Sequence, residues 1–349
     1  MPNVRESIFY NRLPSDKVEC ILCERKCVIP SGEYGFCRTR INIEGKLYTV
    51  VYGALSAIES RPIEIKPFFH YWPGSTSLTF STWSCNFSCP WCQNWTLSKA
   101  TPDTGSMHYY RPEDVANLAI ECGDEGLCAS FQEPTLLTDW NMDLFEIGCK
   151  MGLYACYVSN GYMTLEALKM LRCSGMDGLK IDIKGDLEVY EKFCGGIDVE
   201  KIWRNVREAK KLGFHVELVN LVVTDVNDDE ECLRAIIERA LKEAGPDTPL
   251  HFTRYYPAYR FEKPATSIKT LEDAYKMAKS MGILYPYVGN VPGHKYEHTY
   301  CPNCNEALIK RRGFRIIKYR VTEDKKCPKC GFSINVYGRY IRKRERLLI

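Results

Sequence analysis

The chain has 349 residues, enough for one large domain with one or two small additions. Its hydrophobic fraction of 45% and charged fraction of 26% are ordinary for a globular protein. Because the N-terminus lacks an apolar signal region and no eighteen apolar residues run without interruption, we expect no secretion, no membrane span and a cytoplasmic location.

The eighteen cysteines indicate metal chemistry, because a chain of this length without a signal peptide is not expected to form disulfides. Seven of them are scattered among apolar neighbours, where we expect small core residues. The other eleven fall into three close groups: Cys20, Cys23, Cys27 and Cys37; Cys85, Cys89 and Cys92; and Cys301, Cys304, Cys327 and Cys330.

Residues 1–75 form the first expected unit, and its four cysteines lie on loops within eighteen residues. Zinc is one interpretation, because four cysteines close a tetrahedral site and stabilise a segment too short for its own core. A second iron–sulfur cluster is the other, and the sequence leaves both open. Short strands are expected at 46–52 and 54–59, before a proline-rich linker.

The next group, Cys85-x3-Cys89-x2-Cys92, directly follows a strand-like run. Three thiolates suit a soft metal and leave one metal position open, unlike the four ligands of a structural zinc. Iron–sulfur ligation is therefore the natural interpretation. The motif resembles that of the radical S-adenosylmethionine (SAM) superfamily, in which it binds three irons of a [4Fe-4S] cluster and leaves the fourth for SAM. Trp91 is an aromatic residue where that family prefers one, and we add Gln93 to the cofactor-binding candidates.

Residues 76–293 alternate between strand and helix patterns. Strands are expected at 78–81, 127–131, 154–159, 179–183, 216–223, 250–255 and 284–288, and helices at 112–122, 142–151, 165–173, 199–212, 229–244 and 271–280. Repeated βα units imply a parallel sheet with outer helices, and six units predict an α/β fold, a partial (β/α)6 TIM-like barrel. The resemblance implies the same architecture. Active groups should gather at the C-terminal strand ends.

Three candidates for SAM contact follow the second and third expected strands. Gln132 and Glu133 stand where the resemblance implies a segment that binds the methionyl amine, although Phe131 and Gln132 replace its glycines. Glu133 could pair with the ammonium group, and a helix-capping loop is the alternative. Asn160 can hydrogen-bond to ribose or carboxylate, or form an Asn-Gly turn.

Later strands supply the remaining candidates. Asp182 and Lys184 lie on one side of a strand by its period of two, so these opposite charges should be paired or ligand-bound. They resemble the Asp-x-Lys of glycyl-radical activating enzymes, where the lysine neighbours the SAM carboxylate. Asn220, His251 and Tyr256 are added as cofactor-binding candidates, with a satisfied core histidine as the alternative for His251.

Residues 294–349 form the last expected unit. Two Cys-Pro-x-Cys knuckles separated by a strand-rich insert predict a zinc ribbon, with rubredoxin-like iron as the competitor. Although the net charge of the chain is only +3, residues 305–349 carry fourteen Lys and Arg against four Asp and Glu. Contact with nucleic acid and a solvated tail both explain this balance.

Taken along the whole chain, the cysteine groups and the Gln132-Glu133-Pro-Thr segment resemble the AmmeMemoRadiSam-system radical SAM proteins, which are similar to pyruvate formate-lyase activating enzyme. This implies an enzyme that cleaves SAM to a 5′-deoxyadenosyl radical for hydrogen abstraction, supplied by a ferredoxin- or flavodoxin-like electron donor. Its substrate could be a protein, a small metabolite or tRNA. The alternative of another class is a non-catalytic, cysteine-rich protein that binds metal or nucleic acid.

Overall fold

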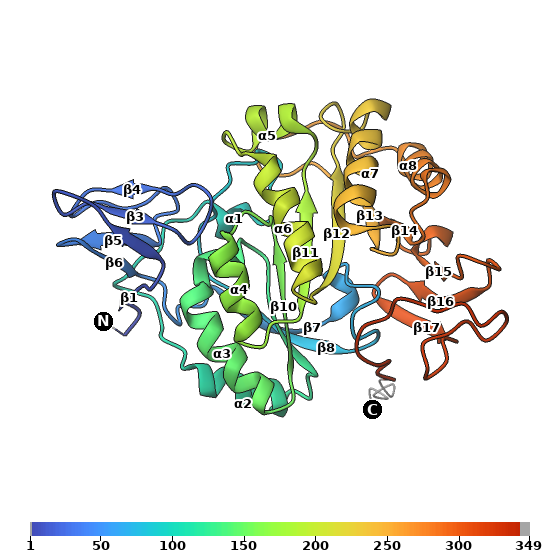
Figure 1. Cartoon of the computed structure of the whole chain (residues 1–349), viewed down its shortest axis with the longest axis horizontal. Coiled ribbons are helices and arrows are strands. Elements are labelled where there is room, and N and C mark those ends of the chain that lie inside the picture. Colours follow the sequence, from blue (N-terminus) through green and yellow to red (C-terminus); the bar gives the residue numbers. More distant parts are fainter. Residues whose placement is uncertain (1, 343–349) are drawn as a thin grey trace.

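The computed structural model describes residues 2–342. A strand-rich N-terminal unit, a central α/β region and a strand-rich C-terminal unit follow one another across the molecule (Figure 1). The final part of the predicted basic tail, residues 343–349, lies outside the described residues.

The centre is an eight-stranded sheet in the order β14-β13-β12-β11-β10-β9-β8-β7. Strands β8 to β14 are all parallel, whereas β7 is an antiparallel edge strand paired with β8. The bounds are β7 (Ala57–Pro62), β8 (Thr76–Ser81), β9 (Gly126–Ala129), β10 (Tyr154–Ser159), β11 (Gly178–Ile183), β12 (His215–Val222), β13 (Leu250–Arg254) and β14 (Pro286–Gly289). The predicted α/β class and its parallel strands are confirmed. A sheet of this kind is typical of the radical SAM partial barrel.

Helices follow most of the parallel strands and pack on the outside of the sheet (Figure 1). Their bounds are α1 (Trp95–Ser98), α2 (Pro112–Glu121), α3 (Thr138–Lys150), α4 (Leu165–Cys173), α5 (Leu187–Phe193), α6 (Val199–Lys211), α7 (Glu230–Ala244) and α8 (Ile268–Met281). In α6, the apolar residues Ile202, Val206 and Ala209 recur at helical spacing and are buried against the sheet. Helices α1 and α5 were not predicted from the sequence, because they are too short to show the helical spacing of apolar residues.

The N-terminal unit consists of two small antiparallel sheets. Their strands are β1 (Arg5–Glu6), β5 (Arg40–Ile43) and β6 (Lys46–Thr49) in one, and β2 (Tyr10–Arg12), β3 (Val18–Cys20) and β4 (Val28–Ile29) in the other. The unit packs on the central region through three salt bridges, from Arg5 to Asp143, from Arg40 to Asp139 and from Arg204 to Glu24. The strand expected at 54–59 begins later, as β7, and joins the central sheet rather than this unit.

The C-terminal unit is a three-stranded antiparallel sheet of β15 (Thr299–Tyr300), β16 (Ala307–Arg312) and β17 (Arg315–Tyr319). It packs against the end of the central sheet through Phe69, Tyr285 and Tyr287, which share an apolar cluster with Leu308 and Ile309. Among residues 2–342, no helix is both long and apolar enough to cross a bilayer.

A buried carboxylate connects the linker between β7 and β8, residues 63–75, to the central sheet. Glu217 on β12 accepts hydrogen bonds from the backbone amides of Phe69 and His70, at 3.0 and 2.7 Å, and from the Nε2 atoms of His215 and His251, at 3.0 and 2.7 Å. Burial alone would raise the pKa of Glu217, but the hydrogen bonds from the two histidines outweigh it and lower this pKa.

The C-terminal unit reaches the same linker through Arg311 on β16, whose Nη2 donates to the carbonyl oxygen of Phe69 at 2.8 Å. Both Glu217 and Arg311 are almost fully buried. Backbone groups of one short linker thus bind the central sheet and the C-terminal unit together.

Replacing Glu217 with alanine leaves four buried donors without their acceptor. We expect the free energy of unfolding to fall by about 3–5 kcal/mol, measured anaerobically by urea denaturation. The exposed Glu231 on α7 provides the control, because its replacement with alanine should change stability by no more than about 0.5 kcal/mol. Equal stability of the two variants would contradict this role for Glu217.

Candidate active site and metal centre

The loop that carries Cys85, Cys89 and Cys92 begins just after β8 and leads into α1, at the C-terminal side of the parallel sheet. All three cysteines are free thiols; Cys89 is buried, and Cys85 and Cys92 are half-buried. Trp91 packs against Phe193 and Phe261, with ring centroids 5.5 and 5.7 Å apart. The tryptophan therefore serves as an apolar wall of the loop.

Hydrogen bonds from other parts of the chain fix the shape of this loop. Asn160 Nδ2 donates to Asn86 Oδ1 at 2.7 Å, Arg25 Nε donates to the carbonyl oxygen of Asn86 at 2.6 Å, and Lys99 Nζ donates to that of Phe87 at 3.0 Å. The contact with Cys194 and the charges of Lys184 and Lys99 outweigh burial and lower the pKa of Cys89 to about 7. A lower pKa favours the thiolate, which is the form that binds iron.

The donor set of the loop fits an iron–sulfur cluster. It offers three sulfur ligands and leaves one metal position for another ligand, as the sequence predicted. Among residues 2–342, three or more ligand atoms lie mutually within 4.8 Å only at Cys301, Cys304, Cys327 and Cys330. The loop sulfurs are thus spaced too widely for one ion, as expected where each thiolate binds a different iron.

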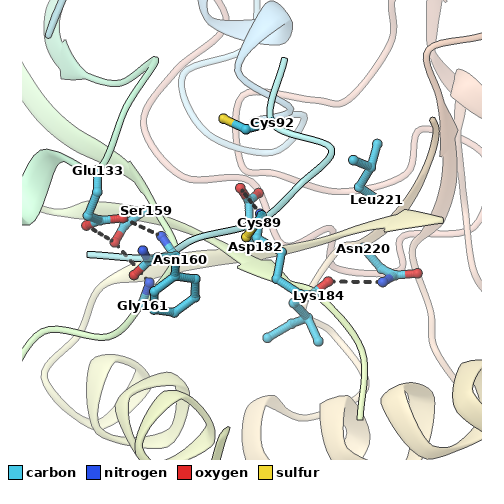
Figure 2. A network of polar contacts seen from close by, with 12 residues as sticks. Cys89, Cys92, Glu133, Ser159, Asn160, Gly161, Asp182, Lys184, Asn220 and Leu221 are labelled. Carbon is cyan, nitrogen blue, oxygen red and sulfur yellow. Dashed lines mark hydrogen bonds and ion pairs between the residues drawn. The ribbon is translucent and has the colours of Figure 1, made fainter. Parts of the chain in front are cut away.

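Asp182 on β11 pairs with two lysines, one of which, Lys184, is drawn with it in Figure 2. Lys180 Nζ contacts Asp182 Oδ1, and Lys184 Nζ lies 3.0 Å from Asp182 Oδ2. Burial would raise the pKa of Asp182, but the two lysine charges lower it to about 2. The group of three therefore carries one excess positive charge, which suits an anionic ligand such as the carboxylate of SAM.

Glu133 holds two strand ends together and has little capacity left for a ligand (Figure 2). Its Oε1 accepts from Thr135 N, Thr135 Oγ1 and Ser159 Oγ, and its Oε2 accepts from Asn160 N at 2.8 Å. Burial raises the pKa of Glu133 despite these donors. The alternative of a capping loop describes this residue, since Glu133 is the N-cap of the 3-10 turn Pro134–Leu137.

Phe131 stands at a position where the resemblance implies a glycine. Phe131 adopts a φ of 70°, the left-handed region that glycine occupies readily and other residues rarely. Its carbonyl oxygen accepts from Asn94 Nδ2, and Lys66 Nζ lies 4.0 Å from its ring centroid. These contacts hold a phenylalanine in a glycine-like backbone conformation.

Several buried polar atoms near the C-terminal ends of β9 and β12 have no hydrogen-bond partner among the described residues. They are Gln132 Nε2 and Oε1, Asn220 Oδ1 and Thr224 Oγ1. Buried polar atoms are nearly always paired in folded proteins, so these atoms fit a polar ligand bound beside them. Asn220 is held in place by donating its Nδ2 to the carbonyl oxygen of Ile183 at 3.0 Å.

Three predicted residues are not brought into this group. His251 is fully buried, bonds to Glu217 and packs against Phe69 and Tyr287, so its imidazole serves the linker rather than a cofactor. Tyr256 is 49% exposed and donates to the carbonyl oxygen of Asn290. Gln93 is exposed on the loop. His251 therefore lies in the core beside the linker, bonded through Nε2, while its Nδ1 has no hydrogen-bond partner among the described residues.

Sequence reasoning missed three residues at the site: Asn86, Lys180 and Cys194. Lys180 could have been found, because it lies two positions before Asp182 and so shares its face of the strand. Cys194 Sγ lies 3.7 Å from Cys89 Sγ although 105 residues separate them in the chain, and no local pattern indicates this contact. Asn86 offered only its position beside Cys85 as a signal.

The C-terminal cysteines form a compact group of four. Cys301 Sγ lies 3.5 Å from Cys330 Sγ, and Cys304 Sγ lies 3.6 Å from Cys327 Sγ. Four sulfurs around one tetrahedral zinc are about 3.8 Å apart, so this spacing fits a single ion. The predicted four-cysteine group is confirmed, while zinc as its metal stays a prediction.

Comparisons with known proteins were made for the whole chain. Residues 81–240 match the radical SAM superfamily. The uncharacterized protein MJ0808 of Methanocaldococcus jannaschii is 40% identical over 336 residues, which cover 95% of this chain and 99% of that protein. A probable GTP 3′,8-cyclase of Metallosphaera sedula is 28% identical over 177 residues, or 50% of this chain and 53% of that protein.

Among solved structures, a domain of pyruvate-formate lyase-activating enzyme from Bacteroides vulgatus is similar to 47% of this chain and 99% of its own length. The TM-score of that match is 0.41 and the sequence identity is 18%.

The C-terminal metal should be separable from the iron of the loop. Replacing Cys301 with serine removes one of four ligands, so we expect the loss of about one zinc per chain and a lower unfolding temperature. The visible absorption of the iron–sulfur centre should stay unchanged. Metal analysis and absorption spectra check this, and a parallel loss of iron would contradict the division of the two sites.

Lys184 should contribute to SAM binding through its charge. A charge-assisted hydrogen bond contributes about 1.5–3 kcal/mol, so Lys184→Gln should weaken SAM binding about 10- to 100-fold. Equilibrium binding to the reconstituted protein measures this, with iron content as the check that the cluster is intact. The exposed Lys276 on α8 gives the matched control Lys276→Gln, and equal affinity in both variants would refute the assignment.

Proposed function

The chain belongs to the radical SAM superfamily, and on that premise we propose that it cleaves SAM reductively at a [4Fe-4S] cluster held by Cys85, Cys89 and Cys92. The observation that carries the proposal is the position of three free thiols at the C-terminal side of the sheet, beside an excess positive charge and unpaired polar atoms. When bound there, the cluster and SAM would supply a 5′-deoxyadenosyl radical for removal of hydrogen from a substrate.

The residues of the chain would bind and orient SAM in this reaction. Lys184, kept charged by Asp182, would hold the SAM carboxylate, because Asp182 raises the pKa of Lys184 against the effect of burial. Gln132 and Asn220 would donate to and accept from the polar groups of SAM, which would pair their buried atoms.

The surroundings of the loop would protect the reaction from solvent. Trp91, Phe193 and Phe261 form an apolar wall on one side of the cysteines. Excluding water from such a site strengthens its electrostatic contacts and prevents side reactions of reactive species.

For the substrate, we propose a protein that the enzyme activates or modifies. The support is the resemblance of Asp182-Ile183-Lys184 to the Asp-x-Lys of activating enzymes, and of the whole chain to the AmmeMemoRadiSam-system family. The electron would come from a ferredoxin- or flavodoxin-like protein. Modification of a small metabolite or of tRNA is the competing outcome of a substrate search.

The proposed chemistry is tested anaerobically on reconstituted protein. We expect the electron paramagnetic resonance (EPR) signal of the reduced cluster to change when SAM is added, and 5′-deoxyadenosine to form. Cys89→Ala should abolish both, because it removes one of three iron ligands. The exposed Cys173 gives the matched control Cys173→Ala, which should behave as the unaltered chain. A full cluster with neither response to SAM would overturn the proposal.

A further inference from the structure

The four cysteines of the N-terminal unit are gathered around one pocket that the proposed reaction does not use. Cys20 ends β3, Cys27 directly precedes β4, Cys23 lies in the turn between them, and Cys37 lies in the loop before β5. All four are free thiols, three of them buried and Cys27 half-buried. Together they line a single pocket whose other walls are mostly apolar.

We propose that Cys20, Cys23, Cys27 and Cys37 bind a second [4Fe-4S] cluster, which serves as an electron-transfer centre beside the first. This inference deepens the proposed function and rests on it. The sequence left both zinc and an iron–sulfur cluster open for these four cysteines, and the inference selects the cluster.

The spacing of the sulfur atoms distinguishes a cluster from a single ion. A tetrahedral zinc holds its four sulfurs about 3.8 Å apart, as the C-terminal group does. Among the described residues, the four C-terminal sulfurs all lie within 4.8 Å of one another, whereas no three of the N-terminal sulfurs do. In a cluster, each thiolate binds its own iron, and a wider arrangement is required.

Two buried donors at the pocket point to the same kind of ligand. Arg40 and Asn86 both line the pocket: Arg40 Nε has no hydrogen-bond partner in residues 2–342, and the Asn86 side chain is directed at the Cys23 thiol. The other nitrogens of Arg40 are fixed by Thr39, Thr49 and Asp139, which hold the guanidinium in place. Donors of this kind would hydrogen-bond to sulfur, and such bonds tune the reduction potential of iron–sulfur clusters.

The apolar walls of the pocket suit a buried redox centre. Leu22, Ile29 and Leu136 line it together with the cysteines, and all three side chains are almost fully buried. Solvent exposure is one of the factors that set the reduction potential of a cluster, so this burial shields the centre and fixes its potential. Leu136 comes from the central region, so the pocket is complete only when the N-terminal unit is packed there.

The two cluster sites are neighbours through Asn86. This residue directly follows Cys85 in the first site and also lines the N-terminal pocket. With four cysteine ligands, the second cluster has no open iron for SAM or substrate, which leaves electron transfer as its role. One electron enters from a reduced ferredoxin- or flavodoxin-like protein, which is oxidised, and the same electron passes to the first cluster; no bond or proton is transferred.

Metal analysis of complementary variants tests the assignment. The triple variant Cys85→Ala, Cys89→Ala, Cys92→Ala lacks the ligands of the first cluster. It should keep half of the iron and acid-labile sulfide of the reconstituted chain, together with the C-terminal zinc. The double variant Cys20→Ala, Cys23→Ala should keep the other half of the iron and sulfide, which belongs to the first cluster. The exposed thiols Cys122 and Cys149 give a matched control, whose replacement with alanine should leave the iron content unchanged.

The two proposals fail separately in this experiment. If the triple variant of the first site holds no iron and about two zinc ions per chain, the N-terminal site is a zinc site and the second cluster is overturned. The SAM-dependent EPR signal of the unaltered chain and of the Cys122→Ala, Cys149→Ala control does not depend on this choice of metal, so its absence there would instead contradict the proposed function.

The proximity of the clusters has its own readout. Two neighbouring paramagnetic clusters speed up each other's relaxation, so the EPR signal of the fully reduced chain should saturate at higher microwave power than the signal of either cluster variant. Equal saturation in all three proteins would contradict a shared wall at Asn86. Because the triple variant leaves the N-terminal unit intact, a folding defect in Cys20→Ala, Cys23→Ala does not remove this test.

Discussion

The site depends on the hydrogen bonds that hold the loop after β8, above all those to Asn86. This loop has little regular structure, so its shape is set from outside, by Asn160 at the end of β10 and by Arg25 from the N-terminal unit. The same asparagine lines the N-terminal cysteine pocket. The small unit therefore belongs to the active end of the molecule, and its packing and the shape of the cysteine loop are linked.

The opposite end of the sheet is organised around buried charged groups that bind the linker between β7 and β8. Glu217 accepts from the linker backbone and two histidines, and Arg311 binds the same linker from the C-terminal unit. At the C-terminal strand ends, in contrast, two buried lysines share one carboxylate, so positive charge is in excess. This difference separates the part of the sheet that stabilises the fold from the part that is prepared for a ligand.

The three cysteine groups differ in geometry in a way that matches their expected chemistry. The C-terminal sulfurs are close enough for one tetrahedral ion, whereas those of the other two groups are not. Cysteine count alone would place the N-terminal and C-terminal groups in one class, since each has four thiols. Spacing in three dimensions separates them, and it is the reason that a cluster is proposed for one and zinc for the other.

The sequence by itself determined the parallel α/β architecture, the three cysteine groups and the Asp182–Lys184 pair, because these follow from local periodicity and spacing. Short elements such as α1 and α5 escaped prediction, since they contain less than two full turns of pattern. Only the tertiary structure decided the roles of His251, Glu133, Asn86 and Cys194. Their partners lie far away along the chain, and the partners of a buried polar group, rather than its residue type, determine whether it supports the fold or faces a ligand.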